Sequence, residues 1–244
     1  MGLTALLLTA CGSVAVGAGT PPPSSATAVP PALLGTVWDR LPVKAKRVAL
    51  TFDAGGNDAG LAAIEQALTD ARVAHATFFL TGAWTRAFPD GARSIAAGGF
   101  LIGNHTDTHP NLPDLSDRQV LGQVRRGRLT IEQTTGVSPV PWFRFPYGAY
   151  DARTLGLVNG RGWVAIGWTI DTLGWKGTSG GQSVESVVDR ALVGARRGAI
   201  VMMHVGSNPD DQSTLDADAL PAVINGLRAA GYRFCTVAVL LNTG

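Results

Sequence analysis

Three short clusters in this sequence of 244 residues carry side chains that could perform acid–base or metal chemistry. His105 and His109 stand four apart in N-H-T-D-T-H-P, His204 ends the apolar run A-I-V-M-M-H, and Asp53 ends the run V-A-L-T-F-D. Each cluster follows a segment typical of a buried strand, and the ends of such strands meet at one rim of an α/β protein. An acid and three imidazoles gathered at one rim indicate a metal-assisted hydrolase.

The histidine pair has the spacing of two ligands on one turn of chain. If the segment after the strand turns helically, His105 and His109 share a face and can meet one divalent ion. An open catalytic site usually adds a third protein ligand, commonly a carboxylate, and leaves room for water. The zincin pattern H-E-x-x-H does not apply, because Thr106 occupies the glutamate position. Alone, the pair is also compatible with a polar turn that holds unrelated histidines.

The remaining histidine, His75, precedes the strand pattern A-T-F-F-L and has no accompanying motif. We therefore predict a structural or surface role for it.

The elements that must position these clusters alternate along the chain. Strand patterns cover residues 47–52, 76–80, 100–104, 142–145, 164–170, 199–203 and 232–237. Helix patterns cover residues 58–72, 92–97, 152–158, 184–196 and 220–230, and another helix begins at Ser116, with Gln119 placed for a capping box and Gly136 as its stop. About seven βα units favour a parallel sheet, either a closed or nearly closed barrel or an open doubly wound sheet. No G-x-G-x-x-G follows the first strand, so dinucleotide binding has little support.

The first 38 residues contain no charged side chain. An apolar start leads into L-T-A-C, which resembles the lipobox of bacterial lipoproteins, although no Lys or Arg precedes it. Cys11 would then carry the lipid. We predict a signal and lipobox segment at residues 1–11, a Pro/Ala/Ser/Thr-rich tether at 12–39 and one catalytic domain at 40–244. The protein would be exported and held at the outer face of a membrane by its lipid; an apolar, disordered N-terminus is the alternative.

The composition is that of a globular protein with a large core, with 45% hydrophobic and 16% charged residues and a formal net charge of +2. No run of Lys or Arg indicates nucleic acid or a basic membrane patch. We expect a monomer that contacts a membrane only through a lipid anchor. Cys235 lies in a strand pattern and is expected in the core.

Five motifs occur in a fixed order: V-A-L-T-F-D-A-G-G, N-H-T-D-T-H, F-R-F-P-Y-G, D-T-L-G-W and V-M-M-H. Together they make the chain resemble the polysaccharide deacetylases of the NodB homology family, carbohydrate esterase family 4. The resemblance runs from Arg47 to about Leu241. It implies a distorted (β/α) barrel, one divalent metal ion (zinc first, with cobalt, nickel or manganese as alternatives) and removal of acetyl groups from an N- or O-acetylated glycan.

The resemblance also implies roles for single residues. Asp53 matches the catalytic base, Arg144 the arginine that orients it, and His204 the general acid. His105 and His109 match the metal ligands. Trp175 matches an aromatic wall of the substrate site, and Pro146, Tyr147 and Gly148 match the rest of the arginine motif.

These roles suit the hydrolysis of an acetamide, which is a poor electrophile. A metal would polarise its carbonyl and acidify a water, whose proton Asp53 would accept. Arg144 would keep that carboxylate ionised. A backbone N–H near Tyr147 would help to hold the oxyanion, and His204 would protonate the departing amine. Trp175 offers a flat face to a sugar ring.

The sequence departs from the family pattern at two acids. Ala54 replaces an aspartate that ligates the metal, and Gly174 replaces one that tunes the catalytic histidine. We predict that Asp58, in the turn G-G-N-D, supplies the missing ligand, with capping of the next helix as the alternative. We predict that Asp171 supports His204, with a turn aspartate bonded to its own backbone as the alternative.

Three functions compete for this sequence. The leading one is a glycan deacetylase outside the membrane, acting on peptidoglycan amino sugars or related chitooligosaccharides. An amidohydrolase for a small amide and a non-catalytic binder of cell-wall glycan are the alternatives. Metal content and acetate release separate the first from the last.

Overall fold

The computed structural model describes residues 29–242, and within them a parallel sheet forms the centre of the fold. Its strands are β1 (Val37–Trp38), β2 (Arg47–Ala54), β3 (Ala76–Leu80), β4 (Leu101–Asn104), β5 (Trp142–Phe143), β6 (Val164–Ile166), β7 (Ile170–Asp171), β8 (Ala199–His204) and β9 (Arg233–Phe234). β2, β3 and β8 are almost wholly buried, as expected of parallel strands covered on both faces.

The strand order is β1-β6-β5-β4-β3-β2-β8-β7, with β9 also paired to β2, and every pairing between strands is parallel. The chain between β6 and β7 links the two ends of this path, because Gly167 N–H donates to Trp38 O and Thr169 N–H donates to Ile200 O. The sheet therefore curls into the predicted distorted barrel. The sheet has nine strands instead of about seven. The predicted strand 164–170 is split into β6 and β7, and β1 was not predicted.

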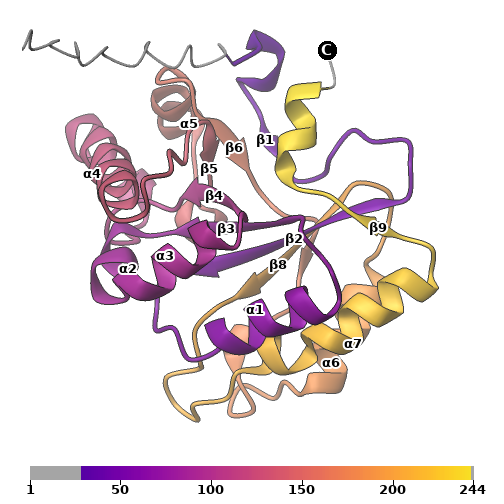
Figure 1. The fold of residues 1–244 in the computed structure, drawn as a ribbon. Helices are drawn as coiled ribbons and strands as arrows, with labels where there is room; N and C mark the ends of the chain where they lie inside the picture. Colours follow the sequence, from indigo (N-terminus) through magenta and orange to yellow (C-terminus); the bar gives the residue numbers. More distant parts are fainter. Residues whose placement is uncertain (1–28, 243–244) are drawn as a thin grey trace, which may run out of the picture.

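Helices surround the sheet (Figure 1). They are α1 (Leu61–Asp70), α2 (Gly82–Ala87), α3 (Pro89–Ala97), α4 (Asp117–Thr135), α5 (Ala152–Asn159), α6 (Val184–Val193) and α7 (Leu215–Ala229). α7 packs between α1 and α6, and α4 packs against α2, α3 and α5. The predicted limits of α4 are confirmed: Gln119 makes the capping box at Ser116, and Gly136 ends the helix with a left-handed φ of 72°.

One helix begins earlier than the sequence pattern indicates. α7 starts at Leu215, five residues before the predicted start, and carries Pro221 inside it. Proline favours the first turn of a helix, and the helix was therefore predicted to begin next to Pro221. The earlier start puts Asp216 and Asp218 into the first turn, where the helix dipole favours negative charge.

Part of the predicted tether belongs to the folded body. Leu33 is buried, Trp38 Nε1 donates to Leu33 O at 3.0 Å, and β1 pairs with β6. The folded part therefore reaches back beyond residue 40, to about residue 29. The predicted lipobox and the first part of the tether lie outside the described residues. In residues 29–242 no helix is long and apolar enough to cross a membrane.

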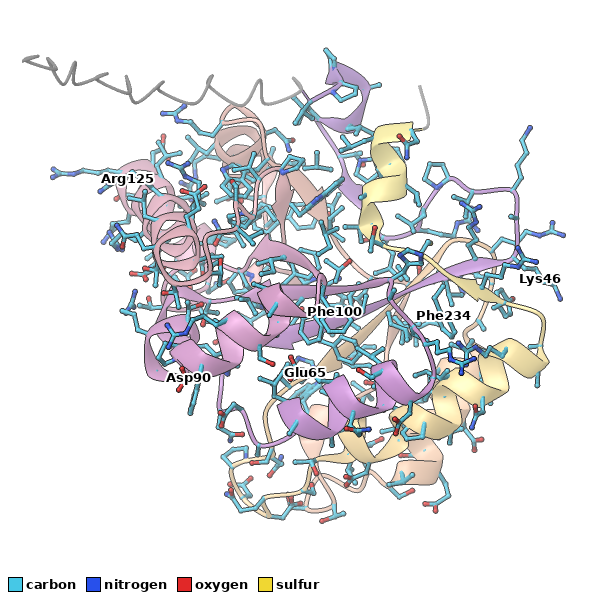
Figure 2. The ribbon with its side chains drawn as sticks, viewed as in Figure 1. Lys46, Glu65, Asp90, Phe100, Arg125 and Phe234 are labelled. Atoms are coloured by element: carbon cyan, nitrogen blue, oxygen red, sulfur yellow. The ribbon has the colours of Figure 1, made fainter. Side chains whose placement is uncertain are left out.

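The main core lies between the sheet and the layer formed by α1, α3, α6 and α7. Phe78 stacks on Phe52 with ring centroids 5.0 Å apart and meets Phe100 at 5.2 Å. Figure 2 shows Phe100 on this covered side of the sheet, whereas Lys46 points to solvent. This packing holds β2, β3 and β8 rigidly in register, and so fixes the residues at their ends.

Candidate active site

A cavity of about 580 Å³ opens at the carboxyl ends of the central strands. It is lined by Asp53, Gly55, Gly56, His105, His109, Phe145, Tyr147, Trp168, Asp171, Trp175, Met202, His204, Gly206, Ser207 and Pro209. The parallel register explains the gathering: Asp53 on β2 is the direct neighbour of His204 on β8, and His105 directly follows β4. The predicted rim is therefore present.

Asp53 forms a buried ion pair with Arg144. Its Oδ1 accepts a hydrogen bond of 2.6 Å from Nη1 of Arg144, whose other nitrogens donate to the carbonyls of Ile166 and Gly167. The Arg144 guanidinium also lies 4.1 Å from the ring centre of Phe79. Burial alone would raise the pKa of Asp53, but Arg144 and the nearby histidines hold it below its ordinary value. The carboxylate is thus ionised and ready to accept a proton.

The two imidazoles of the histidine pair converge on one point. Nε2 of His105 and Nε2 of His109 are 3.1 Å apart, and the rings meet edge to face. Nδ1 of His105 is 2.9 Å from the carbonyl oxygen of Arg144, which assigns its proton to Nδ1 and leaves the Nε2 lone pair free. Burial lowers the pKa of His105 to about 4, although Asp53 opposes the shift, and burial also lowers the pKa of His109.

This geometry fits two ligands of one divalent ion. Two nitrogens on a tetrahedral zinc, each about 2.0–2.1 Å from it, would stand roughly 3.3 Å apart. Neutral imidazoles are also the form that binds metal. The third ligand is a different matter, because no group of three or more His, Cys, Asp or Glu side chains within residues 29–242 is arranged to hold a metal. Within residues 29–242, one carboxylate oxygen lies within 4.0 Å of the ring nitrogens of His105 and His109. It is Oδ2 of Asp53, at 3.6 Å from Nε2 of His105.

The structure does not bring Asp58 to the histidines. Asp58 is absent from the cavity lining, and its turn is held elsewhere, by Asn57 on Ser207 and by Gly60 on the carbonyl of Val205. Nor does it cap α1, whose N-cap is Gly60 without a side-chain hydrogen bond. Neither reading of Asp58 matches its position, and a ligand role would require this turn to move.

His204 has a carboxylate neighbour that the sequence did not indicate. Oδ2 of Asp216, in the first turn of α7, lies 3.5 Å from Nδ1 of His204 and accepts a hydrogen bond of 2.8 Å from its backbone N–H. Burial alone would lower the pKa of His204, but Asp216, Asp53 and Asp171 raise it above its ordinary value. The imidazole is therefore poised to carry a proton.

Asp171 lines the cavity but is not the direct partner of His204. Its Oδ1 accepts a hydrogen bond of 2.9 Å from the backbone N–H of Leu173, and it forms no ion pair with the ring in the described structure. This is the turn arrangement that we held as the alternative. Its charge still acts on His204 from a distance, with less effect than that of Asp216.

Aromatic side chains form the walls of the cavity. Tyr147 is 69% exposed and meets the ring of His109 edge to face at 4.5 Å, and Trp175 is 45% exposed with its ring centre 6.4 Å from that of His204. These two therefore stand beside the polar groups and present free faces. Phe145 and Trp168 also line the cavity. Such faces suit the apolar side of a sugar ring.

The backbone around the cavity is strained. Thr106, His109, Tyr147 and Leu173 all have positive φ, between 58° and 72°, and all follow strands that end at the rim. Residues other than glycine rarely adopt this conformation, and such strain persists mainly at functional sites. Gly148, with φ of 65°, allows close contact with Trp168, because a Cβ there would lie 2.7 Å from the indole.

Most of the predicted site residues are thus brought together, and His75 is exposed and remote, as predicted. Pro146 is buried behind Tyr147. Asp216, Trp168 and Phe145 are site residues that the sequence did not indicate. Trp168 lies in the break between β6 and β7, inside the segment 164–170 that was predicted as one strand. A predicted start of α7 at Leu215 would have placed Asp216 in the first turn of that helix.

The fold and the site together define a hydrolase of the acid–base type, with an ionised carboxylate and a proton-carrying imidazole on neighbouring strands of a parallel barrel. Comparison with known proteins then gives the family. The sequence model of the polysaccharide deacetylases matches residues 40–165. The chain belongs to the polysaccharide deacetylase family, a family of enzymes.

Three proteins illustrate what the chain is similar to. A chitooligosaccharide deacetylase of Azorhizobium caulinodans is 31% identical, covering 76% of this chain and 90% of that protein. A solved peptidoglycan N-acetylglucosamine deacetylase superposes with a TM-score of 0.75 at 30% identity, covering 83% of this chain and 91% of that one. A carbohydrate esterase family 4 pseudoenzyme from Bacillus anthracis gives a TM-score of 0.72 at 29% identity, covering 81% and 66%. Because an inactive member of the family shares this fold, the residues of the site, and not the fold, decide whether such a protein is catalytically active.

Proposed function

We propose that this chain is a divalent-metal-dependent deacetylase that removes acetyl groups from the amino sugars of a glycan. Peptidoglycan is the substrate that we favour. The observation that carries the proposal is the pairing of Asp53 with Arg144 and of His204 with Asp216, where Asp53 and His204 lie on neighbouring strands and line one aromatic cavity. The named activities of the relatives from Azorhizobium caulinodans and of the solved peptidoglycan enzyme support the substrate class.

The residues of the chain divide the reaction between them. Water adds to the acetyl carbonyl carbon while Asp53 accepts its proton, and the buried Arg144 keeps the carboxylate charged for that step. The carbon–nitrogen bond then breaks as His204 donates a proton to the amine nitrogen. Acetate and a free amino sugar leave. A divalent ion held by His105 and His109 would polarise the carbonyl and lower the pKa of a water.

The walls of the cavity favour a sugar over a small amide. Tyr147 and Trp175 present exposed aromatic faces on both sides of the polar groups, which a small amide would leave uncovered. The proposal also places the enzyme outside the cell membrane, because the L-T-A-C segment is typical of exported lipoproteins. That segment lies outside the described residues.

Acetate release tests the proposal. Purified protein is incubated with chitooligosaccharides, peptidoglycan fragments and acetylxylan, before and after chelation and after addition of zinc or cobalt. We expect release from an amino-sugar substrate, loss on chelation and recovery with metal. Full activity in metal-free protein would contradict the metal dependence.

The second candidate is a non-catalytic glycan binder. The pseudoenzyme among the structural neighbours and the alanine at position 54 favour it. Glycan binding by metal-loaded protein that releases no acetate from any of the three substrates would establish it.

A further inference from the structure

Asp216 is a buried carboxylate whose oxygens contact Thr172 and His204. It is 3% exposed. Its Oδ1 accepts a hydrogen bond of 2.6 Å from Thr172 Oγ1, and its Oδ2 accepts one of 2.8 Å from the backbone N–H of His204. These two bonds hold the carboxylate in a single orientation, with Oδ2 at 3.5 Å from Nδ1 of the imidazole.

The ring nitrogen on that side has no other partner in the described structure. Nδ1 of His204 is buried and makes no hydrogen bond. A movement of roughly half an ångström would bring it to hydrogen-bond distance from Asp216 Oδ2. The charged groups that act on the ring from the surrounding elements are Asp216 on α7, Asp53 on β2 and Asp171 on β7, with His109 across the cavity. Of the three carboxylates, only Asp216 comes within 4.0 Å of the ring nitrogens.

Gly174 makes room for this carboxylate. A Cβ at position 174 would lie 2.3 Å from Oδ1 and 2.5 Å from Cγ of Asp216, distances that real Cβ atoms do not tolerate. Both Gly174 and Asp216 are therefore required for the observed arrangement. A side chain on position 174 and the carboxylate of Asp216 are alternative occupants of the same space.

We infer that Asp216 is the positioning residue of His204, and that it occupies the place from which a side chain at position 174 would otherwise support the ring. The inference rests on the proposed function. By accepting a hydrogen bond from the N–H at Nδ1, Asp216 would fix the orientation of the imidazole and leave Nε2 to donate a proton to the leaving amine. It is not a catalytic residue, since it is absent from the cavity lining.

Exchange of the two positions tests the inference. Asp216→Ala should lower kcat by about 10- to 100-fold with little change in KM, as losses of supporting partners do at related sites. Gly174→Asp alone should also lower kcat, because the space is taken. The double variant Gly174→Asp/Asp216→Ala should recover most of the activity, because one carboxylate then replaces the other. Asp218→Ala, in the same turn of α7 but exposed, is the matched control and should stay near wild type.

Two kinetic outcomes would each overturn it: Asp216→Ala with a kcat within about twofold of wild type, a change too small for a lost supporting partner, or a folded double variant no better than Asp216→Ala. A second readout needs no activity. The imidazole of His204 is titrated by nuclear magnetic resonance, and its midpoint should fall in Asp216→Ala and not in Asp218→Ala. If wild type releases no acetate while the midpoint falls, the proposed function fails and the inference stands; an unchanged midpoint refutes the inference.

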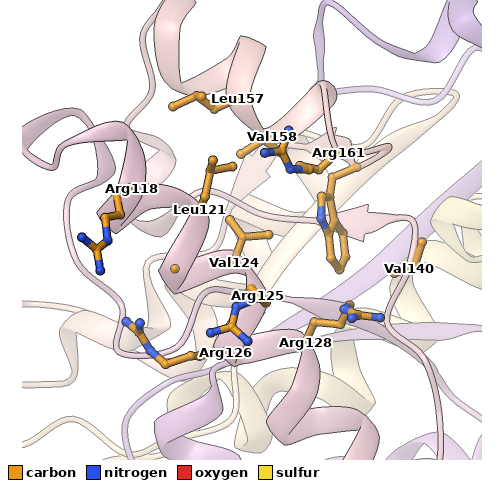
Figure 3. Close-up of a pocket in the computed structure, with 12 residues that line it drawn as sticks. Arg118, Leu121, Val124, Arg125, Arg126, Arg128, Val140, Leu157, Val158 and Arg161 are labelled. Carbon is orange, nitrogen blue, oxygen red and sulfur yellow. The ribbon is translucent and has the colours of Figure 1, made fainter.

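A separate hollow, of about 890 Å³, lies between α4, α5 and the start of β6, and it shares no residue with the active-site cavity. Figure 3 shows guanidinium groups around an apolar floor. The arginines are Arg118, Arg125, Arg126, Arg128 and Arg161, and the lining contains no Asp or Glu. Val124, Val158 and Trp163 are the buried part of the floor.

Two of the five charges have partners. Arg126 pairs with Asp107 at 2.9 Å and Arg128 with Glu132 at 3.3 Å. Arg118, Arg125 and Arg161 make no ion pair within residues 29–242. Three uncompensated guanidinium groups therefore face one recess in a chain whose formal net charge is only +2.

We propose that this hollow binds a segment of a linear phosphodiester polymer. The forked guanidinium matches phosphate oxygens in pairs. Arg118 and Arg125 are seven residues apart on α4, about 10 Å along the helix, and Arg161 faces them from the end of α5, so successive phosphates can be held between two sides. The floor is recessed, which suits an inserted chain better than the flat surface of a bilayer.

Binding of synthetic poly(glycerol phosphate), followed by calorimetry at several salt concentrations, tests this second proposal. The triple variant Arg118→Gln/Arg125→Gln/Arg161→Gln should bind at least about tenfold more weakly and show a shallower salt dependence. The control carries the same number of changes at exposed arginines elsewhere, Arg72→Gln/Arg196→Gln/Arg233→Gln, and should bind like wild type. Equal binding by the two triple variants would refute the proposal. Binding to vesicles of anionic phospholipid without binding to the polymer would assign the hollow to a membrane instead.

Discussion

At the scale of single residues, the contact between Arg144 and Asp53 decides over which pH range the site holds a base. The carboxylate is buried, and burial raises its pKa, whereas the guanidinium lowers it. A carboxylate accepts a proton only above its pKa. The acid limb of the pH–rate profile should therefore lie below the ordinary range of an aspartate.

Arg144→Gln should move that acid limb to higher pH. The amide keeps hydrogen-bond donors in place but removes the charge, so burial then dominates the pKa of Asp53. Arg93→Gln, which breaks only an exposed ion pair with Asp90, is the control and should leave the limb where it is. An acid limb that stays in place in folded Arg144→Gln protein would refute the role of the guanidinium.

The histidine pair carries a second prediction at this scale. His105→Ala and His109→Ala should each weaken zinc binding by more than the roughly 10- to 100-fold that follows loss of an outer partner, because each removes a ligand nitrogen. His75→Ala removes an exposed imidazole far from the cavity and should retain metal. Metal content of the purified variants, measured by atomic emission, checks this; equal content in all three would exclude the pair as the metal site.

At the scale of elements, close packing between β3 and β4 supports the arginine. Gly103 on β4 lies against the ring of Phe79 on β3, and a Cβ there would come within 2.5 Å of it. The Arg144 guanidinium lies 4.1 Å from the centre of the same ring. The glycine thus leaves room for the Phe79 ring, which in turn packs against the arginine that orients Asp53.

Gly103→Ala should lower the free energy of unfolding by about 1–3 kcal/mol through overpacking and reduce activity at the same time. Gly156→Ala is the matched change in α5, where nothing lies within 4 Å of the added atom, and it should instead stabilise the protein by about 0.5–1 kcal/mol. Chemical denaturation measures both. Equal effects of the two substitutions on the free energy of unfolding would refute the claim that close packing requires a glycine at position 103.

At the scale of the whole molecule, we propose that the N-terminal segment determines where the protein is located. L-T-A-C at residues 8–11 predicts acylation of Cys11 and attachment to a membrane, and this part lies outside the described residues. Cys11→Ser should release the expressed full-length protein from the membrane fraction into the soluble fraction. Catalysis should be unaffected, because the residues that line the active-site cavity all lie within residues 53–209. Identical fractionation of mutant and wild type would reject the lipobox.

The sequence alone determined a parallel α/β fold and most of its rim, whereas the choice of a barrel over an open sheet came from the resemblance to the deacetylase family. Buried apolar strands alternate with amphipathic helices, and in a parallel sheet the residue after each strand must emerge at one edge, so Asp53, His105 and His204 had to meet. Local signals also sufficed for α4, whose capping box and C-terminal glycine lie within the helix itself. These features depend on neighbours in sequence or on the period of the strand.

Tertiary structure alone decided which acids serve the site. Asp216 reaches Thr172 across 44 residues, and only the packing of α7 against α1 and α6 brings its first turn to the end of β8. The same packing fills the space above Gly174, which the sequence presented as a loss. Asp58 and Asp171, nearer in sequence to the missing acids, are held by their own turns. Proximity in sequence could not predict these partners, because a turn aspartate such as Asp171 can bond to the backbone beside it, and the position of the turn that holds Asp58 depends on contacts distant in the sequence.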